Sequence, residues 1–236
     1  MHIKTQMKNA VFALLLLPIL SFANTEVHLD KAPIDASNHA SLQRGARTFI
    51  NNCLNCHSAS YMRYNRLQDI GLTEKQIKEN LLFTADKVGD PMTAAISKND
   101  AKKWFGVAPP DLSVEVRARG ADWVYTYMRS FYRDSTRPSG WNNLVFDKSA
   151  MPHVLYELQG EQALDHETHT LNLVKPGKMS AEEYDVFVGD LTNFMAYMAE
   201  PAKQQRNHLG WFVLLFLGVL LILTIKLKKA YWKDIH

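Results

Sequence analysis

The sequence predicts a mainly α-helical domain followed by a single C-terminal transmembrane helix. Capping boxes at Thr73–Gln76 and Ser180–Glu183 each open a segment whose apolar residues recur at helical spacing. Strand patterns are scarce, and only residues 168–174 alternate apolar and polar side chains, which weakly indicates a hairpin arm. Residues 209–225 contain no charged side chain, which indicates a membrane span.

The composition indicates one globular domain with short appendages. Of 236 residues, 47% are hydrophobic and 22% are charged, which excludes a disordered chain or a purely membrane-embedded one. The formal net charge is +3, but lysines crowd both ends, and the segment between them has slightly more acidic than basic residues. A nucleic-acid-binding protein needs a basic face, so this function is excluded. A mildly acidic body suits a basic protein partner better.

The first 23 residues have the pattern of a secretory signal peptide. Lys4 and Lys8 precede an apolar run over residues 10–20, and small residues end the segment at Ala23. An uncleaved anchor is the alternative, but the run is shorter than the ~20 residues that cross a bilayer. We therefore expect residues 1–23 to be removed and the domain at 24–208 to lie on the exported side.

The second apolar segment is long enough to span a membrane. Lys226 can extend its charged end to the interface, so we place the transmembrane helix at residues 209–227. A buried core helix is the alternative, but such a helix seldom lacks a polar stripe. The lysines that follow place the tail, residues 228–236, in the cytoplasm, and Trp211 and Trp232 suit the two interfaces.

Two further helical segments are expected in the body, and the end of the helix that begins after Ser180 can be predicted. Residues 41–52 form a helix that leads into a cysteine pair, and Pro109-Pro110 ends any helix before it. A stripe of apolar and aromatic residues over 122–131 predicts a second helix, with core packing the more ordinary role for the stripe. The helix that begins after Ser180 continues until Pro201.

The motif Cys53-Leu54-Asn55-Cys56-His57 indicates covalent haem attachment. Both cysteines of the chain lie in it, and C-x-x-C-H places two thiols beside one edge of a porphyrin and an imidazole on its iron. A zinc site would need distant ligands such as His153, His166 or His169. A thiol–disulfide oxidoreductase would need a βαβ context that the surrounding pattern lacks. We therefore expect one covalently bound c-type haem.

A second axial ligand is expected for an electron-transfer haem, and a thioether raises the potential relative to a second histidine. Met151, before Pro152 in a long irregular segment, is the favoured candidate, although a buried loop methionine is the ordinary alternative. Met92 and Met179 also lie in loops and remain open. The backbone carbonyl of Pro109 or Pro110 is a candidate acceptor for the second ring nitrogen of His57. Arg119 is a candidate partner for a haem propionate, and a solvated arginine is its alternative.

Together these residues resemble the bacterial form of the cytochrome c1 family. The resemblance covers the body and the tail. It is carried by these segments: Gly45 and Phe49 before the C-x-x-C-H motif, Trp104 to Ser113 with its Pro-Pro-Asp-Leu-Ser, Arg117 to Gly120, Ala150-Met151-Pro152, and Ala199-Glu200-Pro201 before the single span. The resemblance implies a class I cytochrome c-like haem domain, in which Met151 is the sixth iron ligand, Arg119 lies by a propionate and Trp123 lies near the haem. It also implies that Gly45 with Phe49 and Phe194 with Tyr197 belong to crossed first and last helices.

The resemblance also implies a role and partners. The chain would accept single electrons from the Rieske iron-sulfur protein and pass them to cytochrome c, beside cytochrome b in a dimeric bc1 complex of the bacterial inner membrane, with no substrate chemistry of its own. Acidic residues are candidates for steering a basic cytochrome c, although a solvated acidic surface is the more ordinary reading; they are Glu157, Glu161, Asp165, Glu167, Glu182, Glu183 and Asp185.

Two alternatives to this role remain at this point. One is a tethered cytochrome that donates directly to a terminal oxidase, and the other is a membrane-anchored C-x-x-C thiol oxidoreductase. The chain also departs from some relatives, because it has no additional cysteines for a disulfide and its segment 160–179 looks short. The local structure of that segment is therefore open, whereas haem ligation is not affected.

Overall fold

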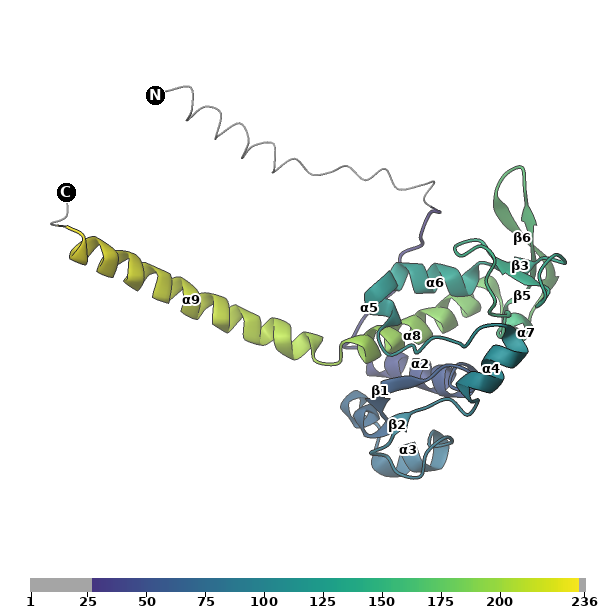
Figure 1. The fold of residues 1–236 in the computed structure, drawn as a ribbon, viewed down its shortest axis with the longest axis horizontal. Helices are drawn as coiled ribbons and strands as arrows, with labels where there is room; N and C mark the ends of the chain where they lie inside the picture. Colours follow the sequence, from purple (N-terminus) through teal and green to yellow (C-terminus); the bar gives the residue numbers. More distant parts are fainter. Residues whose placement is uncertain (1–26, 234–236) are drawn as a thin grey trace, which may run out of the picture.

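A computed structural model describes residues 27–233, and the expected signal peptide, residues 1–23, lies outside this range. Figure 1 shows a helical body from which one long helix, α9, projects. The elements are, in chain order, α2 (His39–Asn52), β1 (Ala59–Arg63), the 3-10 helix η1 (Tyr64–Ile70), α3 (Glu74–Asn80), β2 (Pro91–Met92), α4 (Lys98–Phe105), α5 (Glu115–Arg119), α6 (Ala121–Arg129), β3 (Phe131–Arg133), β4 (Trp141–Asn143), α7 (Tyr156–Gln159), β5 (Gly160–Asp165), β6 (Thr170–Pro176), α8 (Ala181–Ala199) and α9 (Lys203–Tyr231). The mainly α fold is confirmed.

Both predicted capping boxes are present. Thr73 and Gln76 exchange side-chain and backbone hydrogen bonds at the start of α3, and Ser180 and Glu183 do the same at the start of α8. Each box satisfies N–H groups that the first turn of a helix leaves without partners. The local sequence therefore sets where these two helices begin.

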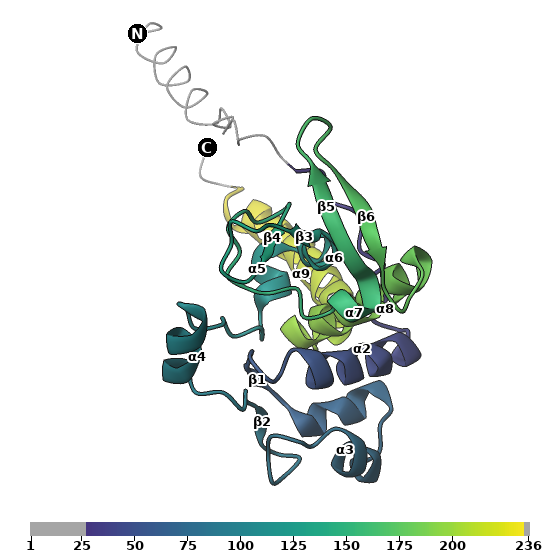
Figure 2. The same cartoon turned by 90° about the vertical axis from the view of Figure 1, so that its right-hand side faces the viewer.

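The body contains more strand than the sequence pattern indicated. Its described part has three antiparallel two-stranded sheets, β1–β2, β3–β4 and β5–β6. The expected hairpin arm is β5–β6, which projects from the body in Figure 2. The helix expected over 122–131 ends at Arg129, because Phe131 pairs with Asn143 in the β3–β4 ladder. Strands β2, β3 and β4 have only two or three residues, which is too short to show alternation, so sequence periodicity missed them.

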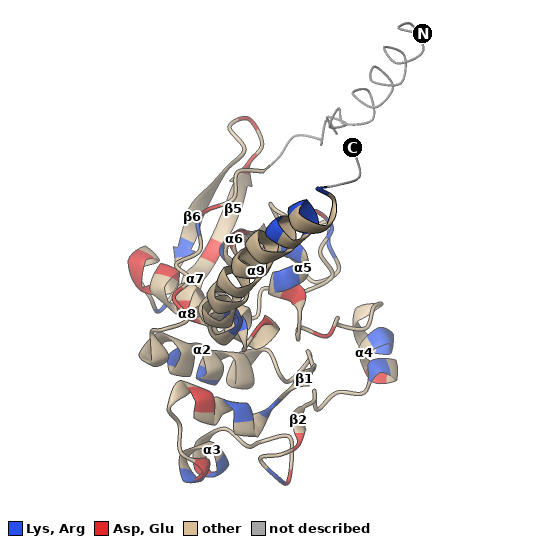
Figure 3. Cartoon of the chain, turned by 90° about the vertical axis from the view of Figure 1, so that its left-hand side faces the viewer, with Lys and Arg blue, Asp and Glu red and all other residues tan. Residues whose placement is uncertain are grey.

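The span predicted at 209–227 lies inside α9. This helix has 29 residues, and its most apolar 18-residue window has a mean hydropathy of 2.4, with none of that window buried against the body. In Figure 3 the ribbon of α9 is tan along its middle, which is the colour of uncharged residues. Its length and composition suit a membrane crossing, which needs about 20 apolar residues.

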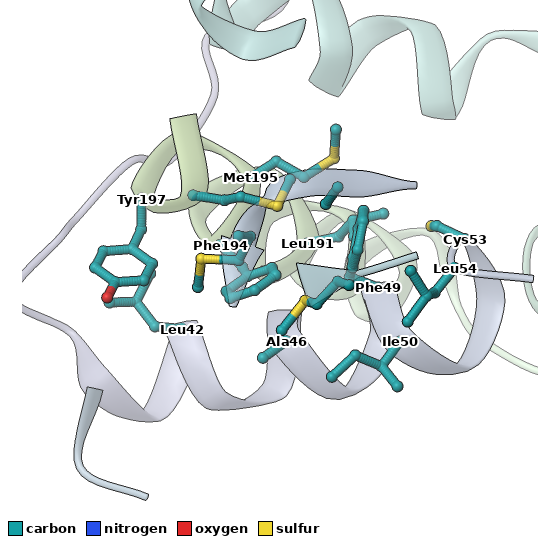
Figure 4. Packing of buried hydrophobic residues seen from close by; sticks show 14 of the residues in the cluster. Leu42, Ala46, Phe49, Ile50, Cys53, Leu54, Leu191, Phe194, Met195 and Tyr197 are labelled. Atoms are coloured by element: carbon teal, nitrogen blue, oxygen red, sulfur yellow. The ribbon is translucent and has the colours of Figure 1, made fainter. Parts of the chain in front are cut away.

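The core is centred on the crossing of α2 and α8. A Cβ atom added to Gly45 would lie 2.0 Å from the backbone oxygen of Asp190 and 2.7 Å from the Cβ of Phe194, so only glycine permits this approach. Phe49 and Phe194 pack beside the crossing, with ring centroids 5.8 Å apart. Figure 4 shows both rings in the same cluster of buried side chains as Cys53. The crossing therefore fixes the end of α2, where the cysteine motif begins.

Candidate functional site

A cavity of about 260 Å³ opens beside the C-terminal end of α2. Its wall is mostly apolar and comes from the cysteine motif, the proline segment that follows α4, the pair α5–α6, the core of α8 and the loop before α7. All seven residues that the sequence singled out line it: Cys53, Cys56, His57, Pro110, Arg119, Trp123 and Met151. Residues separated by about a hundred positions thus meet at one site.

The cysteine motif forms a compact turn at the end of α2. Cys53 caps the helix, with its N–H bonded to the carbonyl of Phe49 at 2.9 Å. The N–H groups of Cys56 and His57 then donate to the carbonyl of Cys53, at 3.1 and 2.8 Å. This turn places both thiols and the imidazole on the wall of the same cavity.

The imidazole of His57 is oriented by the proline segment. Its Nδ1 lies 2.8 Å from the carbonyl oxygen of Pro110, and because a carbonyl only accepts, Nδ1 must carry the proton. Nε2 is then the nitrogen with a free lone pair, as an iron ligand requires. Burial lowers the pKa of His57 below its usual value, with the bond to Pro110 acting in the opposite direction, so the ring favours the neutral form.

The environment of Cys53 argues against a thiol oxidoreductase. Burial raises the pKa of the Cys53 thiol to about 12, with the neighbouring Cys56 as the smaller cause. Redox-active C-x-x-C motifs need a thiolate of lowered pKa in an exposed, electropositive place. A buried thiol in an apolar wall lacks that activation.

The described residues offer no set of ligands for a zinc site. Among residues 27–233, no three His, Cys, Asp or Glu side chains are grouped so that they could hold a metal ion. His153 is buried against Phe131, with its ring stacked at 5.0 Å, while His166 and His169 belong to the turn of the β5–β6 hairpin. None of the three lines the cavity beside His57.

Three methionines line the cavity, namely Met128, Met151 and Met195. Met92 is fully buried in the core, and Met179 is partly buried and packs against the core. Neither residue is part of the cavity wall. Of the three loop methionines that the sequence left open, only Met151 therefore faces the same space as His57.

A polar network holds the loop that carries Met151. The amide of Asn143 donates to the carbonyl of Tyr127 and accepts from the backbone N–H groups of Val145 and Phe146. The hydroxyl of Tyr127 is 2.8 Å from that of Ser149, two residues before Met151. The loop is thereby tied to α6.

Arg119 and Trp123 form another part of the wall. The guanidinium of Arg119 lies 4.4 Å from the ring centroid of Trp123 and is bonded to the carboxylate of Glu115, one turn earlier. Trp123 stacks on Tyr127 with centroids 4.9 Å apart. The guanidinium is thus held at the cavity by an aromatic face, while its remaining N–H groups can bond an anion.

From the sequence, no role was assigned to several aromatic and apolar residues of the cavity wall, although two of them lie in the segment Trp104 to Ser113. These are Phe105, Val107, Phe146 and Val154, which line the cavity and are still exposed to solvent. The signal available was weak, because exposed apolar residues in loops are common.

The residues present fit a covalently attached haem. One apolar cavity is lined by two thiols, a neutral imidazole, a thioether and a guanidinium. The thiols suit covalent attachment, the imidazole and the thioether suit the iron, and the guanidinium suits a propionate. Together with the crossed α2 and α8 helices and the apolar α9, they define a membrane-anchored class I c-type cytochrome.

Comparison with known proteins agrees with this class. Residues 29–235 match the model of the Cytochrome C1 family. The chain is 49% identical to cytochrome c1 of Allochromatium vinosum over 96% of its length and 98% of that protein, and 28% identical to that of Rhodospirillum rubrum, over 82% and 81%. It is also 55% identical to a protein of Nitrosomonas europaea named ammonia monooxygenase gamma subunit, over 97% of this chain and 98% of that one.

This chain belongs to the cytochrome c1 family. Members of the family carry a covalently bound c-type haem and transfer electrons as the haem subunit of the cytochrome bc1 complex. The resemblance, the cofactor and the electron-transfer function expected from the sequence are therefore confirmed.

Proposed function

We propose that this chain accepts single electrons from a Rieske iron-sulfur protein and passes them to a cytochrome c, beside cytochrome b in a dimeric complex. The observation that carries the proposal is the shared cavity, which is lined by both cysteines, His57 and Met151. When bound there, the haem supplies a one-electron iron couple.

Each residue of the cavity has a definite role in this proposal. Cys53 and Cys56 would hold the haem through two thioether bonds. His57 would ligate the iron through Nε2, because its Nδ1–H donates a hydrogen bond to the carbonyl oxygen of Pro110. Met151 would supply a second protein ligand to the iron.

Arg119 and Trp123 complete the binding site. Arg119 would pair with a propionate, an anion that is costly to bury alone, through the N–H groups that its bond to Glu115 leaves free. Trp123 holds the guanidinium by a cation–π contact and would cover the cofactor with apolar surface.

The proposal includes an orientation in the bacterial inner membrane. Lysines follow the apolar part of α9 at Lys226, Lys228 and Lys229, and by the positive-inside rule they support a cytoplasmic position for that end. The haem domain, residues 24–208, then faces the periplasm, as removal of a signal peptide over residues 1–23 also requires.

Copurification tests the assembly. A chain tagged after His236 is extracted in mild detergent, and we expect a di-haem cytochrome b and an iron-sulfur protein to accompany it. Recovery with a terminal oxidase, or with subunits of a monooxygenase as the name of the Nitrosomonas europaea relative suggests, would contradict the bc1 setting. Peptide mass mapping across residues 51–58 tests the attachment, and a peptide without tetrapyrrole would contradict the haem carrier.

A further inference from the structure

The side chain of His153 is enclosed in the body, two residues after Met151. His153 is 1% exposed, and its ring stacks on that of Phe131, with centroids 5.0 Å apart and an angle of 3° between the planes. The ring of Trp141 meets the same ring edge-on, with centroids 5.1 Å apart and an angle of 86°. Stacked and edge-on contacts are the favourable geometries of aromatic pairs. Two neighbours thus fix the position and the tilt of the His153 ring.

Both neighbours belong to one strand ladder. Phe131 lies in β3, opposite Asn143. Trp141 lies in β4, opposite Arg133, whose guanidinium is 3.9 Å from the centroid of the Trp141 ring. Alternate residues of a strand point to the same side, so Phe131 and Trp141 lie on one face of the ladder. The ladder therefore provides a fixed aromatic surface against which His153 packs.

The ring of His153 makes no hydrogen bond with the body. Among residues 27–233, neither of its buried nitrogens has a hydrogen-bond partner. Burial lowers the pKa of His153 to about 4; the side chain of Gln159 opposes this change, although its Oε1 is also buried without a partner. Because buried polar atoms without partners cost free energy, the nitrogens do not explain why the ring is held here. The aromatic contacts are the favourable part of the arrangement.

Pro152 connects this ring to the candidate iron ligand. Met151, Pro152 and Val154 line the cavity, whereas His153 does not and points into the body. The ring of a proline fixes its own φ and also restricts the backbone of the residue before it. The link between Met151 and His153 is therefore stiff, so a displacement of His153 also displaces Met151.

The same aromatic cluster holds the loop before Met151. The hydroxyl of Ser149 is 2.8 Å from that of Tyr127, and the ring of Tyr127 meets that of Phe131 edge-on, with centroids 5.0 Å apart. No disulfide can hold this loop, because both cysteines of the chain lie in the attachment motif. On both sides of Met151 the loop therefore depends on contacts that lead to Phe131.

Resting on the proposed ligation of the iron by Met151, we infer that His153 is a positioning residue, whose ring acts as an aromatic anchor for the thioether. Phe131 and Trp141 hold the ring, and Pro152 passes its position to Met151. Neither a proton nor a hydrogen bond of the ring takes part. A loop held by packed rings opens locally when that packing is weakened, so a weaker anchor lets the thioether leave the iron more often.

The test separates the ring of His153 from its nitrogens. His153→Phe keeps an aromatic ring, and His153→Leu replaces it by an aliphatic side chain of similar volume, so neither variant has a ring nitrogen. The full-length protein in detergent is oxidised with ferricyanide and mixed with free imidazole in a stopped-flow instrument. At saturating concentrations, the binding rate reports how often the thioether leaves the iron. We expect the wild-type rate in His153→Phe and a rate about tenfold higher or more in His153→Leu.

Spectroscopy and potentiometry give two further measurements. His153→Leu should lose part of the weak thioether-to-iron band and should have a lower reduction potential, because a thioether ligand raises the potential. His153→Phe should keep both at the wild-type level. Trp141→Leu removes the edge-on contact and leaves His153 in place. It should also speed the binding of free imidazole, and it tests the anchor if His153→Leu does not fold.

Ile77→Ala is the matched control for a general loss of stability. Ile77 is fully buried in α3, which does not line the cavity. Removal of its side chain should lower the melting temperature, as a buried truncation does, without changing the binding rate of free imidazole or the potential. A binding rate raised as much as in His153→Leu would mean that global stability sets the rate, and it would overturn the anchor.

Two further results would overturn the inference. Equal acceleration in His153→Phe and His153→Leu would assign the role to the nitrogens, and wild-type rates in both would mean that the ring does not hold the loop. The wild-type spectrum tests the proposed function separately. A wild-type protein without the thioether-to-iron band would overturn ligation by Met151 and with it the anchor, whereas a wild-type band with unaffected variants overturns only the anchor.

Discussion

The Nδ1 atom of His57 and the backbone oxygen of Pro110 are 2.8 Å apart, although 53 positions separate the two residues. Asp111 helps to hold the two segments together, because its carboxylate accepts from the backbone N–H and the hydroxyl of Ser60 and from the N–H of Ser113. These hydrogen bonds join the segment after the cysteine motif to the proline segment. The orientation of the imidazole depends on a residue that does not touch it.

The first prediction concerns the hydrogen bonds of Asp111. Asp111→Ala leaves the N–H and hydroxyl of Ser60 without their acceptor and should destabilise the protein by about 1–3 kcal/mol. A looser Pro110 carbonyl holds Nδ1 less firmly, which lowers the basicity of His57 and should raise the reduction potential. Potentiometric titration and thermal unfolding measure the two effects. Asp111→Asn retains one acceptor oxygen and should restore part of the stability and part of the reduction potential. An unchanged potential in Asp111→Ala would refute the link between Asp111 and the imidazole.

The second prediction concerns the sixth ligand. Met151→Lys should remove the weak thioether-to-iron band of the oxidised protein and lower its potential, because an amine replaces a soft sulfur ligand. Met128→Leu and Met195→Leu are the matched controls, since both methionines line the same cavity. A band that survives in Met151→Lys and disappears in one of the controls would assign the ligand elsewhere.

The sequence allowed the helix starts and the attachment motif to be predicted because both are local. A capping box at Ser180 needs only its next three residues, and C-x-x-C-H needs only five. Met151 and Arg119 were candidates from the residues alone, and the resemblance gave them roles as an iron ligand and a propionate partner. Trp123 was assigned to the haem only through the resemblance, because its stripe alone indicated core packing.

What the sequence did not show depends on contacts between distant segments. The pairing of Phe131 with Asn143 ends α6 two residues early, and the hydroxyl bond between Tyr127 and Ser149 joins a helix to a loop 22 positions away. Neither has a periodic pattern. The compensation of Glu161 by Arg133 is of the same kind, because 28 positions separate the two residues.

The third prediction concerns the network that holds the Met151 loop. Asn143 is 1% exposed, and Asn143→Ala leaves the backbone N–H groups of Val145 and Phe146 without their acceptor inside the protein. We expect a loss of about 2–3 kcal/mol in the free energy of unfolding and a weaker thioether-to-iron band. Asn172→Ala, at an exposed position of the β5–β6 hairpin, is the control and should change neither. Equal stability of the two variants would contradict the proposed role.

The fourth prediction concerns acid sensitivity at the base of the hairpin. Hydrogen bonds from Arg133 and then Lys175 lower the pKa of Glu161 to about 2, below its ordinary value of 4.5. A carboxylate with a lowered pKa stabilises the fold fully above pH 4.5 and loses that contribution as the pH falls through about 2. The difference in free energy of unfolding between the wild type and Glu161→Gln should therefore shrink between those values. Denaturant titrations at several pH values measure this difference in the free energy of unfolding. A difference that grows toward low pH would contradict the lowered pKa of Glu161.

The last prediction concerns the helix crossing that fixes the end of α2. Gly45→Ala places a methyl group 2.0 Å from the backbone oxygen of Asp190, a distance that no side-chain rotation can relieve, so α2 and α8 must move apart. We expect a loss of about 3 kcal/mol or more in stability. Because Cys53 caps α2, the same movement should also disturb the thiols and lower the yield of covalently attached haem.

Gly89→Ala is the matched control, because nothing lies within 4 Å of a Cβ atom at that position. The two variants differ only in where one methyl group is added. Thermal unfolding compares their stabilities, and Soret absorbance per polypeptide after an acid–acetone wash compares their haem content. A Gly45→Ala protein as stable as Gly89→Ala would mean that the helices do not cross this closely, and the geometry of the whole site, which starts from the end of α2, would have to be drawn again.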